Sequence, residues 1–453
     1  MSSLPMRTIQ HSATNFGRFG LIRSALAVAL SGVLFVTSAG AFLYRALAGQ
    51  VQDRVIDINS FVTNSSDTQT PDSFEGRAVN VLVLGIDSRE GKNSDLGAGD
   101  SEDVGGLRND STMVVHISAD RTRLQVLSIP RDTLVDIPSC RHADGSSSDP
   151  QTEVMFNTSM FTGADGGSEA SDVAPGVACV KATVEQMSGM AVDAFMVVDF
   201  AGFISMVDAL GGVWFNIPED IADDDAGLYI DQGCWKLGGT HALAYMRARY
   251  SLEDGTDISR IGRQQQLISA IMRELQSKNY VTDLPSLVSF LQAAIATVNI
   301  SSNLADPMAD ATLLVNLMSK LDRANMQFVT LPVVAPPWDE NRRITAEPLA
   351  SKVWQAIEDD QALPVGTEYT DGNGAHLTVP DPNAGSSSAP GAGDSSQGQG
   401  ASPSAPGQGA APSNPGQGSE DSTSSQTDVA QANNSAEAEA KNQVDTCPPA
   451  DKR

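Results

Sequence analysis

Three short runs of β-branched and apolar residues open the central part of the chain. They are VNVLVLGI at residues 79–86, TMVVHIS at 112–118 and RLQVLSI at 123–129. Runs of this length, bounded by polar and turn-forming residues, are typical of buried strands. The turn-forming sequence ADRT separates the last two runs. We therefore predict three strands at the start of the folded region.

Strand and helix patterns then alternate along the chain. In residues 176–189, the apolar side chains Val180, Val184 and Met187 recur on one side of a predicted helix. The next predicted elements are a strand at 192–200, a helix at 203–210 and, with its Gly-Gly turn, a strand at 211–217. Before them, residues 139–176 are rich in Gly, Ser and Asp and are predicted to form a long excursion without regular structure.

The clearest helical pattern spans residues 258–278. Its predicted buried stripe consists of Ile258, Ile261, Ile268, Ile271, Met272 and Leu275. Later predicted elements are helices near 285–297 and 306–323, a strand within 326–333 and a closing helix at 349–359. Because alternating strands and helices are typical of an α/β layered domain, we predict the α/β fold class.

The amino-terminal end differs from this pattern. Residues 24–44 carry no charged side chain, and an apolar run of this length is enough to cross a bilayer as a helix. Arg7, Arg18 and Arg23 precede it, which predicts a cytoplasmic amino terminus and a single-pass protein of the cell membrane. A cleaved signal peptide, with AGA at residues 39–41 as its cleavage site, is the alternative interpretation.

The carboxyl-terminal end is rich in Gly, Ser and Pro. It has almost no large apolar residue, so it cannot bury a core and is predicted to be disordered. The predicted organisation is a cytoplasmic segment at 1–23, a transmembrane helix at 24–44, a juxtamembrane connector at 45–76, an extracytoplasmic domain at 77–370 and a disordered tail at 371–453. The folded domain is therefore expected outside the membrane.

Charge and cysteine content narrow the function classes. A formal net charge of −27 opposes general nucleic-acid binding, which needs a basic surface. The four cysteines, Cys140, Cys179, Cys234 and Cys447, have no spacing typical of a zinc site. Cys140 and Cys179 flank one loop region and are candidates for a disulfide in an oxidising compartment. Cys234 has no evident partner.

Against this acidic background, four arginines gather in YMRARYSLEDGTDISRIGRQQQ. They are Arg247, Arg249, Arg260 and Arg263. On the predicted helix, Arg260, Arg263 and Gln264 share a face that borders the apolar stripe, at the rim of the packed region. Arg247 and Arg249 point the same way if the chain is extended there. Guanidinium forks match phosphate oxygens; the alternative is a solvated basic face, or pairing with the nearby acidic residues.

Charged residues also follow or precede the predicted strands. Arg131 follows the strand at 123–129, while Asp87 and Arg89 follow the strand at 79–86. Asp110 lies just ahead of the next strand, and it comes to the same edge as Asp87 if the two strands are antiparallel. Ligands of α/β folds usually bind at the carboxyl ends of strands. Two aspartates beside several arginines are explained by a magnesium ion that bridges them to a phosphate.

Six motifs in a fixed order carry a resemblance to a known family. They are VLVLGIDSR, RNDSTMVVHIS, RLQVLSIPRDTLVDIP, VDALGGV, LGGTHALAYMRAR and DISRIGRQQ, over roughly residues 79–278. In this order they resemble the LytR-CpsA-Psr family. The resemblance implies an α/β/α layered domain with a mixed central sheet, a membrane anchor and an outward-facing site. It also implies an apolar groove for the tail of a polyprenyl-pyrophosphate carrier.

The resemblance implies a role for each matching residue. Asp87 and Asp110 match the family's magnesium-associated aspartates, and Gln264 matches its site glutamine. The residues matching its pyrophosphate-facing arginines are Arg89, Arg131, Arg247, Arg249, Arg260 and Arg263. Asp132 matches an aspartate of the pattern and is grouped with the catalytic candidates. There are two departures: Met155 stands where a lysine is common, and Asn216 where actinobacterial relatives often have a cysteine.

Apolar residues near these motifs have two interpretations. Phe195, Phe203 and Val207 are candidates for the lining of the lipid groove, but apolar residues of this kind are equally expected in a core.

The family implies transfer of a glycopolymer from its polyprenyl-pyrophosphate carrier to a hydroxyl of peptidoglycan or another envelope acceptor, assisted by Mg²⁺, with pyrophosphatase activity as a side reaction. The alternatives are a non-enzymatic polyprenyl-phosphate-binding regulator and a transcription regulator; the acidic charge opposes the latter.

Overall fold

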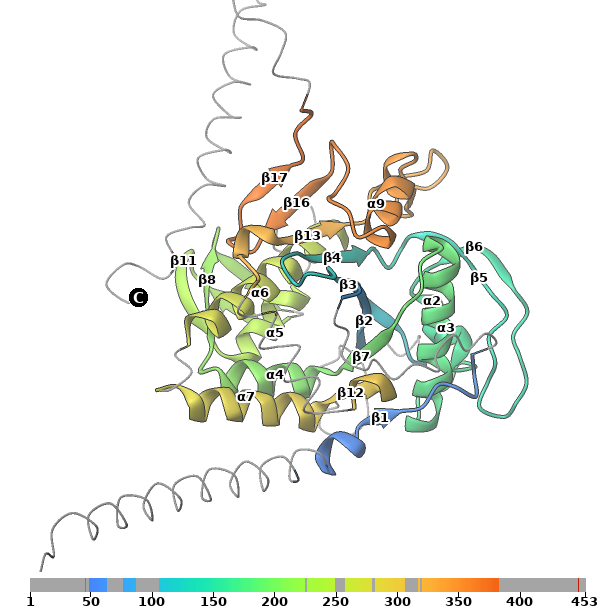
Figure 1. Ribbon diagram of the computed structural model, residues 1–453, viewed down its shortest axis with the longest axis horizontal. Coiled ribbons are helices and arrows are strands. Elements are labelled where there is room, and N and C mark those ends of the chain that lie inside the picture. Colours follow the sequence, from blue (N-terminus) through green and yellow to red (C-terminus); the bar gives the residue numbers. More distant parts are fainter. Residues whose placement is uncertain are drawn as a thin grey trace, which may run out of the picture.

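The structure is a computed structural model of the chain (Figure 1). It describes residues 45, 49–62, 76–86, 106–224, 226–248, 257–278, 282–305, 317, 320–382 and 447. Within these residues no helix is both long enough and apolar enough to cross a membrane. The transmembrane helix predicted at 24–44 lies outside the described part of the chain.

A nine-stranded mixed sheet forms the centre of the domain (Figure 1). In spatial order its strands are β1 (Val55–Ile56), β12 (Val298–Ser301), β7 (Ala194–Val198), β2 (Val79–Ile86), β3 (Asn109–Ile117), β4 (Leu124–Ile129), β13 (Met326–Thr330), β16 (Glu368–Asp371) and β17 (His376–Thr378). β3 is antiparallel to both β2 and β4, an arrangement that the sequence pattern left open. β7 is parallel to β2, and β13 is parallel to β4.

These directions bring several strand ends to one edge of the sheet. β2, β4, β7 and β13 all run the same way, so their carboxyl ends lie at a common edge together with the amino end of β3. In the ladder Ile86 pairs with Asn109, and Thr112 pairs with Ile129. We call this side of the sheet the carboxyl edge. It is the edge at which α/β folds usually bind ligands.

Helices cover both faces of the sheet. The described residues include the helices α2 (Thr158–Gly163), α3 (Ala170–Ser188), α4 (Phe200–Ala209), α5 (Gly239–Arg247), α6 (Asp257–Ser277), α7 (Leu284–Thr297) and α9 (Leu349–Glu358). In Figure 1, α2 and α3 lie on one side of the central strands, and α5 and α6 on the other. The chain therefore has the α/β/α layering expected from the resemblance, around a large mixed sheet.

Alternation along β2 explains the two covered faces. Leu82 and Leu84 point into a cluster with Val180 of α3 and Ile357 of α9. Val81, on the opposite face of the same strand, packs in a cluster that also holds side chains of α6. Because successive side chains of a strand point to opposite faces, a strand covered on both sides must be apolar almost throughout. This is why the run at 79–86 has no polar face.

A second, smaller cluster lies beside the sheet. It is formed by α4, α5, the inner face of α6 and the short strands β8 (Val213–Ile217), β9 (Ile221–Asp223), β10 (Leu228–Ile230) and β11 (Gly233–Leu237). The rings of Phe215 and Tyr245 are 4.7 Å apart at its centre. Tyr245 is 1% exposed, so α5 is held firmly against β8. Arg247, which ends α5, is thereby held in a defined position.

Two sequence predictions need correction, and a third lies largely outside the described residues. The segment at 139–176 is not irregular throughout: it contains strand β6 (Gln151–Met155), paired with β5 (Leu134–Ile137), and helix α2. Ile258, assigned to the buried stripe, is 37% exposed because it lies in the first turn of α6, ahead of the packed part of the helix. Most of the helix predicted at 306–323 lies outside the described residues.

The sheet also reaches beyond the predicted domain limits. β1 lies in the segment expected to be a connector, where it pairs in parallel with β12, and Ile58 joins the main core. At the other end, β16 and β17 continue the sheet into the segment expected to be the disordered tail, from residue 371 onward. β1, β16 and β17 are short strands at the two margins of the sheet. Strands this short do not appear in the sequence as a run of apolar residues.

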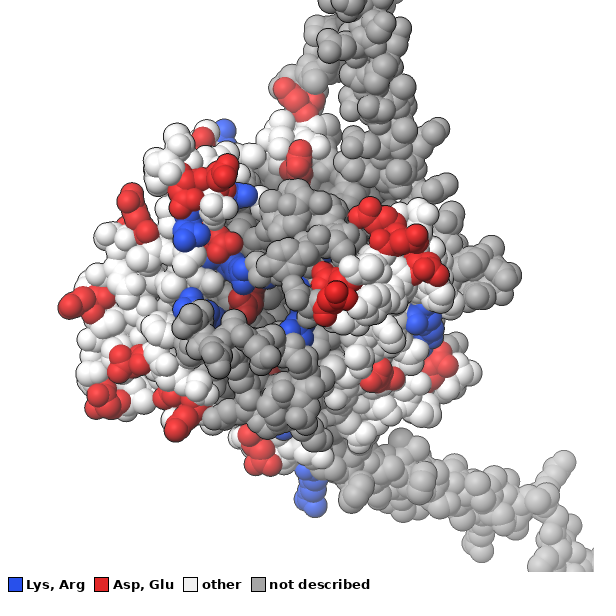
Figure 2. Space-filling model, turned by 180° about the vertical axis from the view of Figure 1, so that it is seen from behind, with Lys and Arg blue, Asp and Glu red and all other residues white. Residues whose placement is uncertain are grey.

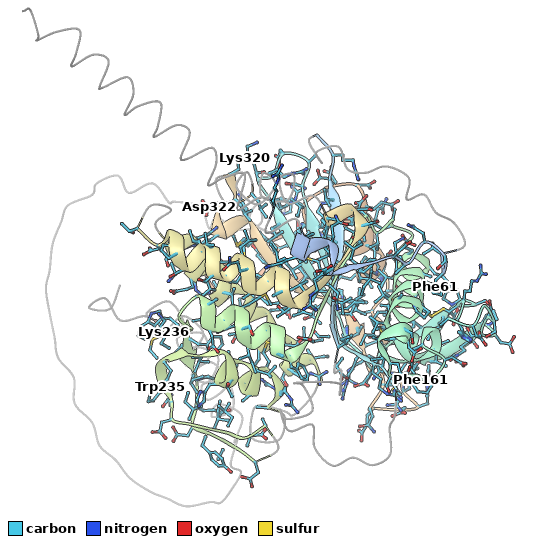
Figure 3. The ribbon with its side chains drawn as sticks, turned by 90° about the horizontal axis from the view of Figure 1, so that it is seen from below. Phe61, Phe161, Trp235, Lys236, Lys320 and Asp322 are labelled. Carbon is cyan, nitrogen blue, oxygen red and sulfur yellow. A yellow bond between two sulfur atoms is a disulfide. The ribbon has the colours of Figure 1, made fainter. Side chains whose placement is uncertain are left out.

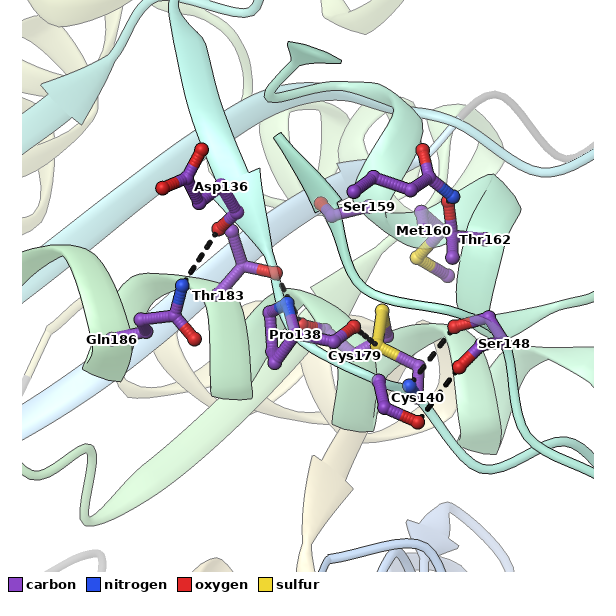
Figure 4. The surroundings of a disulfide bond; sticks show 12 residues. Asp136, Pro138, Cys140, Ser148, Ser159, Met160, Thr162, Cys179, Thr183 and Gln186 are labelled. Carbon is purple, nitrogen blue, oxygen red and sulfur yellow. Dashed lines mark hydrogen bonds between the residues drawn. A yellow bond between two sulfur atoms is a disulfide. The ribbon is translucent and has the colours of Figure 1, made fainter. Parts of the chain in front are cut away.

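Two disulfides are present among the described residues. Cys140 and Cys179 are joined, with Cα atoms 5.3 Å apart, which links the segment after β5 to α3 (Figure 4). This confirms the candidate pair from the sequence. Cys234 is joined to Cys447, a partner that the sequence did not suggest. Asn216, where relatives often have a cysteine, is the cross-strand neighbour of Cys234 in the β8–β11 pair.

We predict that replacing Cys140 and Cys179 together by alanine lowers the free energy of unfolding by about 4 kcal/mol. The bond closes a loop with a sequence separation of 39 residues, and chain entropy gives roughly this value for such a loop. Urea unfolding of the variant and of the oxidised parent measures the difference. A change below about 1 kcal/mol would show that this bond does not constrain the unfolded chain.

Candidate active site

An ion pair between Arg131 and Asp110 marks the carboxyl edge. Arg131 follows the end of β4, and Asp110 lies at the start of β3. Nη1 of Arg131 is 2.9 Å from Oδ1 of Asp110. Both side chains are accessible in part, with 19% and 35% of their surface exposed. The pair is therefore in reach of a ligand at this edge, as the strand directions predicted.

Helix α6 lies over the same edge and contributes buried polar groups. Nη2 of Arg260 is 3.5 Å from the backbone carbonyl oxygen of Asp110. The hydroxyl of Ser111 donates to Oε1 of Gln264 at 3.1 Å. Gln265 donates from Nε2 to the Oγ of Ser128 at 3.0 Å. These hydrogen bonds fix the rotation of α6 about its own axis relative to β3 and β4. They thereby place the Arg260 side chain at the carboxyl edge.

Arg263 has a different role from the one its spacing suggested. Its side chain is 2% exposed, and Nη2 donates to the carbonyl oxygen of Ala248 at 2.6 Å. Ala248 is the carboxyl-terminal cap of α5, so this bond joins α5 to α6. The prediction that Arg260, Arg263 and Gln264 lie at the rim of the packed region is wrong, since all three are buried.

Arg247 ends α5, so the chain at this position is helical and not extended. Its guanidinium carbon lies 5.2 Å from the centre of the Phe200 ring, a cation–π contact. Phe200 begins α4 soon after β7 ends at the carboxyl edge. Arg247 is thereby held near this edge. Arg249 lies outside the described residues, as do Asp87 and Arg89.

Asn157 also belongs to this edge. Its backbone N–H donates to the carbonyl oxygen of Arg131 at 3.0 Å, and Phe156 donates to that of Thr133 at 2.8 Å. The Asn157 side chain is 6% exposed, and its Oδ1 accepts no hydrogen bond in the described part of the chain. Met155, which replaces the expected lysine, ends β6 two residues earlier.

One arginine was missed by the sequence reasoning. Arg108 precedes Asp110 by two residues, and its guanidinium carbon lies 5.3 Å from the centre of the Phe161 ring of α2. Its Nε is buried and donates to no acceptor within the described residues. The signal was present, because Arg108 begins the motif RNDST, which was used for its aspartate alone. We add Arg108 to the candidates.

The structure thus brings together part of the predicted set. Arg131, Asp110 and Arg260 meet directly, and Gln264 is joined to them through Ser111. Asp132 is the next residue, with Oδ2 3.8 Å from Nε of Arg131. No cluster of three or more potential metal-ligating side chains occurs in the described part of the chain. In Figure 2, basic side chains gather around the centre of one face, and acidic side chains are frequent towards its margins.

Comparison with known proteins identifies the family. The model of the LytR_cpsA_psr family matches residues 47–358, which is more than half of the chain. The chain belongs to the LytR-CpsA-Psr family. The match includes β1 and α9, so the family domain begins before the predicted boundary at residue 77.

Several curated proteins and solved structures are similar to this family member. The polyisoprenyl-teichoic acid–peptidoglycan teichoic acid transferase TagU of Oceanobacillus iheyensis is 30% identical over 277 residues, which cover 59% of this chain and 75% of TagU. The cell wall biosynthesis protein LcpA of Corynebacterium glutamicum is 27% identical over 329 residues, 70% of this chain but only 60% of LcpA. The crystal structure of Bacillus subtilis TagV matches with a TM-score of 0.45 and 21% identity, over 64% of this chain and 99% of TagV.

The apolar residues proposed for the lipid groove of this LytR-CpsA-Psr protein are not brought together. Phe195 is 1% exposed in the main core, on β7. Val207 is equally buried, but in the second cluster, and Phe203 packs partly buried against that same cluster. Phe203 and Val207, both on α4, therefore pack in the second cluster, whereas Phe195 packs in the main core.

We predict that Arg263→Lys lowers the free energy of unfolding by about 2 kcal/mol. A lysine loses the forked donor that joins α6 to the Ala248 carbonyl, and hydrogen bonds from charged groups contribute about this much. Denaturant unfolding measures the change. The matched control is Arg273→Lys on the same helix, where the less buried arginine donates to Ser269. Equal effects of the two substitutions would contradict the assigned role of Arg263.

Proposed function

We propose that this protein is a phosphotransferase that moves a glycopolymer from a polyprenyl-pyrophosphate carrier to a hydroxyl of the cell wall, with peptidoglycan as the acceptor. We further propose that residues 24–44 anchor it in the cell membrane, with the domain on the outer side. The observation that carries the proposal is the contact of Arg131 and Arg260 with one aspartate, Asp110, at the carboxyl edge. The similarity to TagU, which is named a polyisoprenyl-teichoic acid–peptidoglycan teichoic acid transferase, supports it.

The local charge of the edge favours an anionic ligand. Two guanidinium groups approach Asp110, one at its carboxylate and one at its backbone oxygen. Gathering cations in a partly buried place is costly unless an anion compensates them. The whole chain carries a formal net charge of −27, so this concentration of arginines is not a general property of its surface. A pyrophosphate is an anion of this kind, and guanidinium forks match its oxygens.

The transfer itself is a displacement at phosphorus. The hydroxyl oxygen of the acceptor attacks the phosphorus that carries the sugar, and a new phosphodiester bond forms. The bond from this phosphorus to the bridging oxygen breaks, and that oxygen leaves with the polyprenyl phosphate. The hydroxyl proton is released. In such reactions catalysis comes mainly from positioning and from stabilising charge on the phosphoryl oxygens, which is the role we assign to Arg131, Arg260 and Arg247.

The described residues fit a magnesium ion held in part by the substrate. Mg²⁺ in phosphate sites is usually bound by one or two carboxylates together with phosphate oxygens. Asp110 supplies an accessible carboxylate at the edge, and we propose Asp87, which follows Ile86 in the sequence, as the second carboxylate. Such an ion would neutralise phosphoryl charge. Water in place of the acceptor hydroxyl would give pyrophosphatase activity.

We predict that Arg131→Ala lowers the rate of transfer by about 100- to 1000-fold, the usual loss when one donor to a developing oxyanion is removed. The assay follows transfer from a purified lipid-linked glycan to peptidoglycan with the full-length protein in detergent. Arg77→Ala is the matched control, because Arg77 forms a similar ion pair with Asp193, 2.7 Å in length, at the opposite edge of the sheet. Unchanged transfer by Arg131→Ala, with Arg77→Ala equally active, would refute the assigned site.

We also predict that transfer requires a divalent cation and that Asp110→Asn raises the Mg²⁺ concentration for half-maximal activity by at least about tenfold. Even groups outside the direct ligand set of a metal typically change its affinity by this factor. Removal of metal with EDTA, followed by titration with MgCl₂, measures the dependence. Asp193→Asn serves as the control. Full activity in EDTA would contradict a metal at this site.

A further inference from the structure

A hairpin continues from the carboxyl edge beyond β13. Its strands are β14 (Val333–Val334) and β15 (Ile344–Thr345), which pair antiparallel. The loop between them spans residues 335–343, with the sequence APPWDENRR. The hairpin leaves the sheet next to Arg131, because the N–H of Leu331 donates to the carbonyl oxygen of Ser128, near the end of β4, at 2.9 Å. It thus begins where the candidate active site lies.

The returning side of this loop is bonded to the residues that follow Arg131 along the chain, on both sides of Thr133. The N–H of Arg343 donates to the carbonyl oxygen of Asp132 at 3.2 Å. The carbonyl oxygen of Arg343 accepts from the N–H of Leu134 at 2.8 Å, and Thr133 bridges to Arg343 in parallel. The segment that carries Arg131 and the base of the loop therefore form one small ladder. A group presented by the loop is held in a defined position beside the site.

Hydrogen bonds inside the loop keep its shape. The N–H of Asp339 donates to the carbonyl oxygen of Pro336, and the N–H of Arg342 donates to that of Asp339. The Asp339 carboxylate accepts from the N–H of Asn341 at 2.9 Å. Pro336 and its neighbour Pro337 restrict the backbone further. A loop ordered in this way loses little conformational entropy when a ligand binds to it.

Trp338 lies at the outer part of this ordered loop. With 68% of its surface exposed, it is the most exposed large hydrophobic side chain of the described residues. An indole in this position contributes little to the core, yet it offers a large flat apolar face with a polar N–H at one end. Aromatic faces of this kind, held rigidly beside a site, suit ligands that combine apolar ring faces with hydroxyl groups.

The charge of the loop argues against a second anion site. Asp339 and Glu340 balance Arg342 and Arg343 in number. The guanidinium of Arg343 donates to the carbonyl oxygens of Glu340 and Arg342, at 2.6 and 2.8 Å, so it serves the loop itself. The donor's pyrophosphate is attracted to the arginines of the carboxyl edge, and the neutral loop suits an uncharged sugar ring.

We propose that Trp338 forms a saccharide subsite that stacks on a sugar ring of the acceptor glycan and presents its hydroxyl to the site at Arg131. The inference rests on the proposed function and assigns the acceptor side of the reaction to the β14–β15 hairpin. Trp338 is five residues from Arg343, at most about 17 Å of extended chain. A polymeric acceptor spans this separation, with one ring on the indole and another at the carboxyl edge.

The test compares Trp338→Ala with the parent protein, using purified peptidoglycan glycan strands as the acceptor and a lipid-linked glycan as the donor. We expect the acceptor KM to rise about tenfold, the effect of losing one aromatic stacking contact, with the KM for the donor unchanged. Trp338→Phe, which keeps an aromatic face, should recover most of the affinity. The matched control is Trp235→Ala. Trp235 lies on β11 and is 43% exposed. In Figure 3 it lies on the opposite side of the molecule from Phe161, whose ring contacts the Arg108 guanidinium.

The outcomes separate this inference from the proposed function. If the parent protein transfers glycan and Trp338→Ala does so with an unchanged acceptor KM, the subsite is refuted while the proposed function stands. If the parent protein transfers no glycan, the proposed function fails; binding of the glycan strands by the parent, weakened about tenfold in Trp338→Ala but not in Trp235→Ala, would then still support the subsite. Equal losses in both tryptophan variants would refute a specific role for Trp338.

Discussion

The ion pair between Arg131 and Asp110 is the contact on which the arrangement of the site depends. It joins the end of β4 to the start of β3 at 2.9 Å, and the other groups are arranged around these two residues. Arg260 reaches the backbone of Asp110, Asn157 donates to the backbone of Arg131, and the hairpin at Arg343 is bonded to the residue after it. Since the pair lies at the end of adjacent strands, the sheet ladder itself sets its geometry.

Helix α6 connects this edge to the rest of the molecule. One side of it packs on the sheet and the other on the second cluster, so Arg263 and Gln264 have no room to turn outward. Burial of Arg263 against the Ala248 carbonyl is costly without its hydrogen bond, and that cost makes the α5–α6 junction specific. The end of α5, with Arg247, is thereby brought to the edge from a separate part of the chain.

Much of the fold and part of the site could be predicted from the sequence. The apolar run at 79–86 is a strand with those bounds, because a strand covered on both faces has to be apolar on both. Asp110 and Arg131 were both assigned to the ends of predicted strands, but the antiparallel β2–β3 pairing and the ion pair between the two residues were decided by the folded structure. Arg108 was missed, although its motif was recognised, because no local pattern assigns a role to an arginine that stacks on a distant phenylalanine.

The sequence by itself determined the long elements of the domain, the fold class and the residue types available at the carboxyl edge, because these depend on periodicity and on motifs of neighbouring residues. Tertiary structure alone decided which side chains are buried and which meet. Arg263 and Gln264 have the spacing of a helix rim, yet both are buried: Arg263 lies on the side of α6 covered by the second cluster, and Gln264 lies against β3, where it accepts from Ser111. Phe195 and Val207 read alike as apolar residues but lie in different cores, and Cys234 pairs with a cysteine 213 residues away. Such contacts between distant segments leave no periodic trace along the chain, so only the folded arrangement reveals them.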